Sequence, residues 1–363
     1  MIDRPGSTVF SHYTAPQWLP GGHLQTVYAY ALRQTMNFTY RHERWDTPDG
    51  DFIDLDWLDP SASAPAFAGG SRSGFRPTGR VKGAMDLPVG LHSPPESTSL
   101  VVLFHGLEGS SRSHYAVSLM NELKRRGLRG VVVHLRGCSG ELNRLARAYH
   151  SGDSSEIDWI LRRFRQREPN LRLYAVGVSI GGNMLLKWLG EQGENALRVV
   201  DRAAAISVPV DLTIGAQRLD VGWSKLIYTS RFLGSMKPKV LAKIAVHGLP
   251  IDGRAIRATS TFREIDDLYT APAHGFRDAI DYWMCSSSKP WLGRIRVPTL
   301  MISACNDPFF PSDALPAAAE VSDCVALEFS QTGGHVGFVT GKFPGDLSWL
   351  PSRILRFFAR SEP

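Results

Sequence analysis

The stretch Gly177-Val178-Ser179-Ile180-Gly181 follows an apolar run, 171–176, and leads into a helix-forming run, 180–189. A G-x-S-x-G sequence between a strand and a helix forms a sharp turn that presents its serine at the edge of a sheet. Residues two before and two after the serine approach closely, so glycine is needed at both places because it has no Cβ. The bare pattern is weak, since glycine and serine are common, and the alternative is a plain glycine-rich turn. The strand and helix around it favour Ser179 as a nucleophile.

The alternation of strand and helix recurs along the chain. Apolar runs predict strands at 100–104, 130–135, 171–176, 202–208, 297–304 and 325–329, and amphipathic runs predict helices at 115–126, 154–167, 180–189 and 349–359. Continuous apolar strands between such helices indicate a mostly parallel sheet flanked by helices, an α/β fold class. Nearer the N-terminus, runs at 38–45 and 52–57 enclose the turn signal Pro48-Asp49-Gly50 and predict an antiparallel hairpin. A short helix over 23–30 is expected to serve packing.

Two segments interrupt this alternation. Residues 59–98 are rich in Ser, Pro, Gly and Ala without a sustained period, which predicts a flexible surface insertion. Residues 211–289 are mostly helical in pattern and stand between two strands, where a cap over a site is expected. Its Trp223, Tyr228, Phe232 and Tyr282 are expected to form an apolar pocket. We therefore predict a single domain over residues 1–363, with a helical cap at 211–289.

A nucleophilic serine needs a base, and the base needs a third group that fixes its tautomer. Asp307 follows the strand at 297–304, and His335 lies on a glycine-rich loop after the strand at 325–329. Both would emerge at the same sheet edge as Ser179, and the order serine, acid, histidine is that of α/β-hydrolases. The nearest rival acid, Asp313, follows Ser312 in what looks like a helix cap. We predict a catalytic triad of Ser179, His335 and Asp307.

An oxyanion intermediate would need backbone N–H donors beside Ser179. One is expected from the residue after the nucleophile, Ile180, and the other from the loop after the strand at 100–104. That loop reads His105-Gly106-Leu107-Glu108-Gly109, and Leu107 is the expected donor. The alternative for Leu107 is an ordinary strand-to-helix connection.

The composition and the motifs argue against several other classes of protein. The net charge of +6 and pI near 9.2 arise from charges spread through the chain, so we expect an ordinary basic surface; the alternative is a preference for anionic surfaces or substrates. Arg162-Arg163-Phe164-Arg165 is expected on a solvated helix face, with no nucleic-acid site. No motif for a metal or cofactor is present, and the four cysteines lie far apart as free thiols. The N-terminal residues lack a signal-peptide pattern and no apolar stretch reaches the ~20 residues that span a bilayer, so a cytoplasmic protein is expected.

Several motifs together resemble the YheT-like branch of the α/β-hydrolases, whose members are classed largely as esterases. The resemblance covers nearly the whole chain outside 59–98. It is carried by the segments His23-Leu24-Gln25-Thr26, Pro48-Asp49-Gly50-Asp51, His105 to Ser111, Arg136 to Gly140, Asn143-Arg144, Tyr149 to Gly152, Gly177 to Asn183, Asn306-Asp307-Pro308 and Gly334-His335.

The resemblance implies the same triad and hydrolysis of carboxylic esters through an acyl-enzyme, on short- to medium-chain or lipid-like acyl esters. Peripheral contact with lipid is compatible with such substrates. Two alternatives remain open: an acyltransferase or thioesterase that uses the same triad, and a non-catalytic ligand-binding α/β-hydrolase. The segments Arg136 to Gly140 and Tyr149 to Gly152 receive no chemical role from the sequence, and the oligomeric state stays undetermined.

Overall fold

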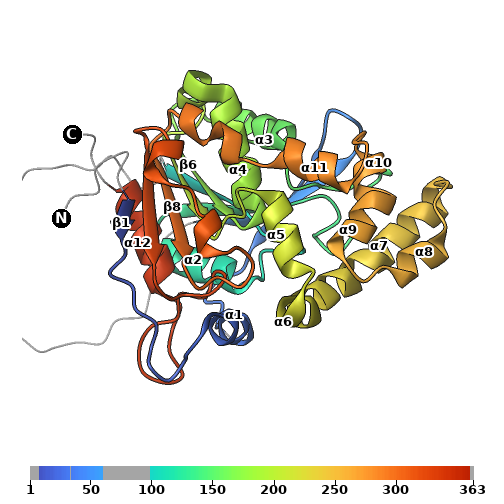
Figure 1. The fold of residues 1–363 in the computed structure, drawn as a ribbon. Coiled ribbons are helices and arrows are strands. Elements are labelled where there is room, and N and C mark those ends of the chain that lie inside the picture. The colour runs from blue at the N-terminus through green and yellow to red at the C-terminus, as the bar shows by residue number, and fades with distance from the viewer. Residues whose placement is uncertain (1–7, 33, 60–98, 360–363) are drawn as a thin grey trace, which may run out of the picture.

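A nine-stranded sheet forms the centre of the part of the chain that the computed structural model describes, residues 8–32, 34–59 and 99–359 (Figure 1). Its order is β1-β9-β8-β7-β6-β4-β5-β3-β2, parallel from β1 to β5 and antiparallel at β3 and β2. The strands are β1 (Thr8–Phe10), β2 (Arg41–Asp46), β3 (Phe52–Leu58), β4 (Ser99–Phe104), β5 (Arg129–His134), β6 (Arg172–Val178), β7 (Arg202–Ile206), β8 (Thr299–Ala304) and β9 (Val325–Ser330). The predicted α/β class and the N-terminal hairpin are confirmed, whereas the short β1 was not predicted.

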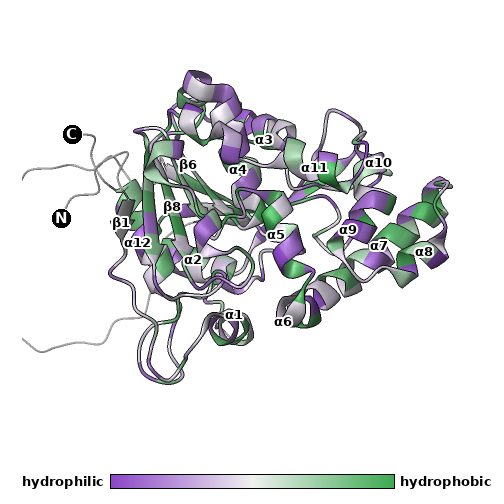
Figure 2. Cartoon of the chain, in the orientation of Figure 1, coloured by the Kyte–Doolittle hydropathy of each residue, from purple (hydrophilic) through white to green (hydrophobic). Residues whose placement is uncertain are grey.

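Helices cover both faces of this sheet. In β4, Leu100, Val102 and Phe104 pack into the core on the side of α3 (Ser154–Arg167) and α4 (Ile180–Gln192). Val101 and Leu103 point to the opposite core, under α2 (His114–Arg125) and α12 (Trp349–Phe358). Because successive strand side chains face opposite ways, a strand buried on both sides must be apolar throughout. The strands in the middle of the sheet are accordingly mostly green in Figure 2, whereas the edge strand β2 is polar.

The segment 211–289 is helical, as predicted, and stands at one end of the sheet (Figure 1). It comprises α5 (Leu212–Leu219), α6 (Gly222–Ser224), η3 (Lys225–Thr229), α7 (Ser230–His247), α8 (Gly253–Ala258), α9 (Phe262–Ile265), η4 (Asp266–Thr270), α10 (Ala271–Ala273) and α11 (Ala279–Ser286). Two of these elements, η3 and η4, are π-helical turns, which the sequence pattern did not predict. We refer to residues 211–289 as the helical insertion.

The remaining helical elements are short. The helix predicted over 23–30 is α1 (Gly22–Ala31), and 3₁₀ turns occur at η2 (Gly193–Arg198), η5 (Lys289–Arg294), η6 (Ser312–Ala314) and η7 (Ala318–Glu320). Apart from Asp59, the predicted insertion at 59–98 lies outside the described residues. Among the helices of the described ranges, none has the length and apolar character needed to cross a membrane. The cytoplasmic location stays a prediction.

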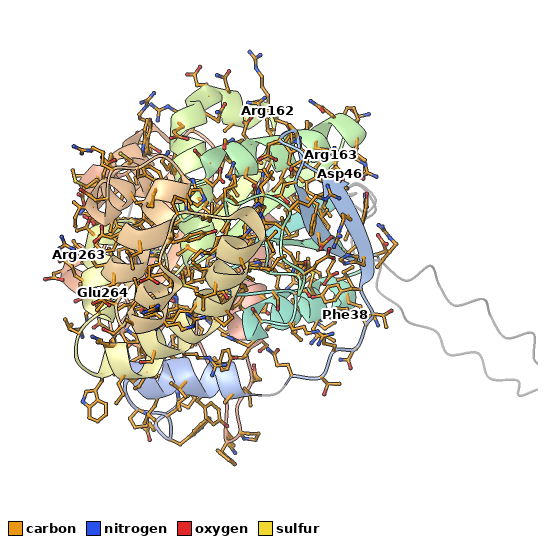
Figure 3. The ribbon with its side chains drawn as sticks, turned by 90° about the vertical axis from the view of Figure 1, so that its right-hand side faces the viewer. Phe38, Asp46, Arg162, Arg163, Arg263 and Glu264 are labelled. Atoms are coloured by element: carbon orange, nitrogen blue, oxygen red, sulfur yellow. The ribbon has the colours of Figure 1, made fainter. Side chains whose placement is uncertain are left out.

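The basic run on α3 lies at the surface, where Figure 3 labels Arg162 and Arg163. Arg162 pairs with Asp158 one turn earlier, at 2.7 Å. The guanidinium of Arg163 lies 4.6 Å from the ring centroid of Trp45, a cation–π contact. Both charges are thus engaged in contacts within the fold.

Candidate active site

Ser179 sits in a turn that only small neighbours permit. It has φ 53°, in the left-handed region that few non-glycine residues adopt, and it directly precedes α4. A Cβ on Gly177 would lie 2.5 Å from the Cα of Gly182, and one on Gly181 would lie 2.5 Å from the carbonyl oxygen of His105. Glycine is therefore required at both places, as the sequence indicated. The strained serine at a strand-to-helix turn is the geometry of a nucleophile elbow.

The three residues predicted as a triad are brought together. The Oγ of Ser179 lies 3.0 Å from Nε2 of His335, and Nδ1 of His335 lies 2.8 Å from Oδ2 of Asp307. All three residues are buried. The backbone N–H of Phe309 donates to Oδ1 of Asp307 at 2.8 Å, and the Phe309 ring stacks on the imidazole with centroids 3.9 Å apart. With the carboxylate accepting from Nδ1–H, Nε2 is left as the atom that can accept a proton from Ser179.

Helix α1 holds the loops that carry the acid and the base, a role that sequence reasoning missed. The Oγ1 of Thr26 accepts the backbone N–H of His335 at 2.8 Å and donates to the carbonyl of Gly22 at 2.7 Å. The Oε1 of Gln25 accepts from the Asn306 amide at 2.9 Å and from the Gly333 N–H at 2.8 Å. Both side chains are buried. The motif at 23–26 was the available signal, but the sequence gave it only a packing role.

The two predicted oxyanion donors, the N–H groups of Leu107 and Ile180, make no hydrogen bond within the described residues. In the loop after β4, the N–H groups of Gly106, Glu108 and Gly109 donate to the Tyr115 hydroxyl, the Tyr149 hydroxyl and the Gly106 carbonyl, respectively. Within the described residues the N–H of Leu107 has no such acceptor. Ile180 is the first residue of α4, where N–H groups have no partner inside the helix.

The peptide that carries the Leu107 N–H is fixed from its other side. Its carbonyl belongs to Gly106 and faces Nδ1 of His105 at 2.7 Å, while Nε2 of the same ring accepts the N–H of Leu135 at 3.1 Å. The Leu135 donor assigns the proton to Nδ1, so His105 donates to the Gly106 carbonyl. Burial lowers the pKa of His105 to about 3, which keeps the ring neutral. A trans peptide held by its carbonyl directs its N–H the opposite way.

Glu108, directly after Leu107, joins the loop to the helical insertion. It has φ 54°, and its carboxylate accepts from the Tyr149 hydroxyl at 3.0 Å and pairs with the ammonium of Lys239 at 2.8 Å. Burial raises the pKa of Tyr149 well above its ordinary value, so the hydroxyl stays protonated. Lys239 lies on α7. The Tyr149 segment, which had no assigned role, thus supports the loop of the predicted oxyanion donor.

The other unassigned segment, which begins at Arg136, forms a buried ion cluster, and Arg136 and Asn143 of this cluster also line the cavity described below. Arg136 is 5% exposed at its side chain and pairs with Asp51 at 3.0 Å and Glu156 at 2.5 Å. Asn143 donates to the same Asp51 carboxylate at 2.6 Å. Burial raises the pKa of Glu156 to about 7, with Asp153 adding to the rise and Arg136 opposing it. This cluster fixes the segment 136–147, which leads to Tyr149.

A cavity of about 680 Å³ opens over Ser179 between the sheet edge and the helical insertion. Its lining includes the triad residues Ser179 and His335, the predicted donors Leu107 and Ile180, and apolar side chains of the insertion. These apolar side chains include Leu212, Ile227, Tyr228, Phe232, Phe262, Tyr282 and Trp283.

Two residues weighed from the sequence, and a further histidine that follows Ser179 in the chain, lie elsewhere. Trp223 was expected in the pocket, which is wrong: its side chain is 71% exposed and lines no part of the cavity. Asp313 lies in η6, and it is Asp307 that contacts His335. His274 faces the carbonyl oxygens of Thr270 and Ala148 rather than Ser179.

Known proteins match this chain over most of its length. Residues 99–342 match the profile of the alpha/beta hydrolase fold family. The chain is 36% identical to the Escherichia coli (strain K12) protein named "Putative esterase YheT", over 92% of this chain and 88% of that protein. It is 31% identical to "Medium-chain fatty acid ethyl ester synthase/esterase 2" of Saccharomyces cerevisiae, over 72% of this chain and 62% of that protein. The solved esterase Pf2001 of Pyrococcus furiosus shares the fold, with TM-score 0.53, 14% identity, and 89% of this chain and 93% of that chain covered.

Proposed function

Because this chain belongs to the α/β-hydrolase family, as a carboxylic ester hydrolase of its YheT-like branch, we propose that it works through a Ser179, His335 and Asp307 triad and an acyl-enzyme. The observation that carries the proposal is the continuous series of contacts from Ser179 Oγ through the His335 ring to the Asp307 carboxylate, at 3.0 and 2.8 Å. Ser179 and His335 also line the cavity of about 680 Å³, which is large enough for an acyl chain.

In the first step Ser179 Oγ attacks the carbonyl carbon of the ester while its proton passes to Nε2 of His335. The carbonyl oxygen becomes an oxyanion that accepts hydrogen bonds from the N–H groups of Leu107 and Ile180. The imidazolium that forms is stabilised by Asp307, which keeps its negative charge. The C–O bond to the alcohol then breaks, and the alkoxide leaves with the proton from Nε2.

In the second step water takes the place of the alcohol. It gives a proton to Nε2 of His335 and attacks the acyl carbon, forming a second oxyanion on the same two donors. Collapse of this intermediate breaks the bond to Ser179 Oγ, which recovers its proton from His335. The products are a carboxylic acid and a free enzyme.

The substrate class follows from the other wall of the cavity. We infer that the helical insertion acts as the cap of a single catalytic domain, and that its apolar side chains take the acyl chain of a short- to medium-chain or lipid-like ester. Phe232, Phe262 and Trp283 line the cavity. The insertion also contributes Arg231, Lys239 and Lys243 to the lining, and each of these cations is engaged within the fold, by Tyr30, Glu108 and the Leu145 carbonyl respectively. Apolar walls with few polar groups are typical of sites that bind apolar chains.

Labelling with a fluorophosphonate probe tests the nucleophile. Wild-type protein should be labelled, Ser179→Ala should not, and Ser303→Ala should be labelled as wild type because Ser303 is a buried β8 serine outside the cavity lining. Hydrolysis of 4-nitrophenyl acyl esters should fall at least about 10³-fold in Ser179→Ala, and a series of chain lengths would define the acyl preference. Folded wild-type protein that neither reacts with the probe nor hydrolyses any ester would make it a non-catalytic binding protein.

The same acyl-enzyme can pass its acyl group to an alcohol instead of water. The yeast relative is named both a synthase and an esterase of ethyl esters. Measuring acid and ethyl ester products from one acyl donor in the presence of ethanol separates hydrolysis from acyl transfer, and an acyl thioester donor tests thioesterase activity.

A further inference from the structure

Exposed apolar side chains gather on α1 and at the start of the helical insertion. On α1, Leu24 is 56%, Val27 42% and Tyr30 59% exposed; on the insertion, Val221 is 56%, Trp223 71% and Leu226 65% exposed. These six residues, which we call the rim patch, make up most of the large exposed apolar side chains found in the described ranges. Single exposed apolar residues are ordinary, whereas a cluster marks an interaction site.

Specific contacts hold the two halves of the rim patch together, although they are about 200 residues apart in the chain. Nδ1 of His23 lies 3.0 Å from the Tyr228 hydroxyl, and their rings stack with an interplanar angle of 8°. The guanidinium of Arg231 lies 4.6 Å from the ring centroid of Tyr30 and hydrogen-bonds its hydroxyl. Figures 1 and 3 both show α1 beside the start of the insertion along the lower edge of the molecule. The patch is therefore one surface.

The cavity reaches the surface beside this patch, because two residues that line it are also exposed. Val27 and Tyr30 from the patch line the cavity, as do Ile227 and Tyr228 on the turn that carries Leu226. The same cavity contains Ser179 and His335. A molecule taken up at the patch would therefore enter the cavity that contains Ser179.

The two segments that carry the patch hold charges of one sign, and the acids next to them, Asp220 and Glu264, are engaged by backbone N–H groups. Neither segment 22–31 nor segment 221–233 contains an aspartate or glutamate, whereas Lys225 and Arg231 lie in the second. The neighbouring Asp220 is turned inward, where its carboxylate accepts the N–H groups of Phe262 and Arg263 at 2.8 and 3.2 Å. Apolar side chains flanked by cations match the surface of an anionic lipid layer.

We propose that the rim patch docks this protein on an anionic lipid surface, with Trp223, Leu226 and Leu24 inserted at the level of the headgroups. Trp and Tyr favour this boundary because each ring has an apolar body and a polar group. A second copy of the chain on the same face would cover the cavity entrance, whereas a lipid surface can deliver an ester through it. The docking stands on the patch itself; the delivery of an ester to Ser179 rests on the proposed function.

Sedimentation with vesicles tests the docking. Wild-type protein should bind vesicles of phosphatidylglycerol mixed with phosphatidylcholine more tightly than vesicles of phosphatidylcholine alone. The combined Leu24→Ser, Trp223→Ser and Leu226→Ser variant should bind the mixed vesicles at least about tenfold more weakly, because it loses the inserted apolar area. None of these three side chains lines the cavity, so hydrolysis of a soluble short-chain ester should match wild type.

The matched control is a variant with three serine substitutions at exposed apolar residues outside the rim patch. Leu197, Val246 and Met284 are 50%, 75% and 66% exposed and lie outside the patch, so the triple serine variant at these positions should bind vesicles as wild type does. The contribution of attraction between the protein and the anionic lipid is tested by Lys225→Gln. Loss of this positive charge should weaken binding to the mixed vesicles about fivefold.

Three outcomes would overturn the docking: no binding of wild type to vesicles, equal binding by the patch and control variants, or a wild-type dimer that the patch variant alone dissociates. The last result would assign the face to a second copy. Vesicle binding with no ester hydrolysis by wild type would leave the docking intact and sink the proposed function instead.

Discussion

The two walls of the cavity are built differently. The sheet wall is formed by the loops at the sheet edge that carry Ser179 and His335, and the insertion wall by residues of the helical insertion, 211–289. On the sheet wall, the acid and the base each have a buried hydrogen-bond partner: Asp307 accepts the Phe309 N–H, and the His335 N–H donates to Thr26 on α1. The insertion wall consists mainly of short helices and π-helical turns, and it presents mostly apolar side chains to the cavity. The most exposed apolar residues of the rim patch, Trp223 and Leu226, also belong to the insertion.

This contrast separates two tasks. Positions on the sheet wall must be accurate because catalysis loses rate when reacting atoms are displaced by even about 1 Å. Apolar contacts on the insertion wall are less directional, so they tolerate changes that alter which acyl chain fits. Changes on the sheet wall should therefore lower kcat, and changes on the insertion wall should alter KM, chain preference or stability.

The largest effect is expected from Asp307→Asn. The amide would place an N–H toward Nδ1 of His335 and force the ring proton to Nε2, so the ring could no longer accept a proton from Ser179. We expect kcat to fall about 10⁴-fold with the fold intact. Ester hydrolysis with a thermal melt checks this. Asp313→Asn is the matched control and should keep wild-type activity; equal losses in both variants would contradict the assignment of Asp307.

A stability effect comes next, on the insertion wall. Asp266 is buried beside the Trp283 indole N–H, 2.8 Å away, and burial raises the pKa of its carboxyl to about 7. Between the unfolded pKa of about 3.9 and that value, the unfolded chain releases a proton that the folded protein keeps. Stability therefore falls as pH rises through this window, by up to about 1.4 kcal/mol per pH unit, and the cost stays constant above it.

Asp266→Asn removes this proton linkage while leaving an oxygen to accept from Trp283. The variant should be more stable than wild type by an amount that grows from pH 5 to pH 7, on the order of 1–3 kcal/mol at the upper end. Urea unfolding at the two pH values measures the gap. A gap that is the same at both pH values would show that the carboxyl is ionised in the folded protein throughout.

Thr26→Val tests whether α1 positions His335 for catalysis. The change keeps the shape of the side chain but leaves the buried N–H of His335 without an acceptor, at a cost of about 1–3 kcal/mol in stability. Displacement of the His335 loop should lower kcat about 10- to 100-fold with little change in KM. Thr26→Ser keeps the hydroxyl and should restore kcat.

The control for this change is Thr299→Val. Thr299 is a fully buried β8 residue whose hydroxyl donates to the Val297 carbonyl at 2.8 Å, outside the cavity. It should lose stability without losing kcat. If Thr26→Val behaves in the same way, Thr26 serves the fold and not the position of His335.

The sequence predicted Ser179, Asp307 and His335 as neighbours because local rules decide where these three residues lie. The pattern of glycines two before and two after Ser179, and the presence of an acid and a histidine in the loops that follow the two late strands, placed Ser179, Asp307 and His335 at one edge. Gln25 escaped prediction because its partner Asn306 is 281 residues away, and only the folded chain brings them together. Trp223 was placed inside the pocket because hydrophobic character alone does not tell which side of a short helix faces solvent.

The smallest effect is expected where the two walls meet, at Tyr149. Tyr149→Phe removes the acceptor of the Glu108 N–H and the donor to the Glu108 carboxylate, while the ion pair with Lys239 remains. The loop that carries Leu107 should then hold an oxyanion less well, lowering kcat about 5- to 10-fold, the value of roughly one hydrogen bond, with KM unchanged.

Tyr13→Phe is the control: its buried hydroxyl donates to the Val339 carbonyl at 2.8 Å, away from the cavity, and its loss should lower the melting temperature alone. A rise in KM at constant kcat would instead show that Tyr149 acts in substrate binding, as the insertion wall does, and not in holding the loop of the oxyanion donor.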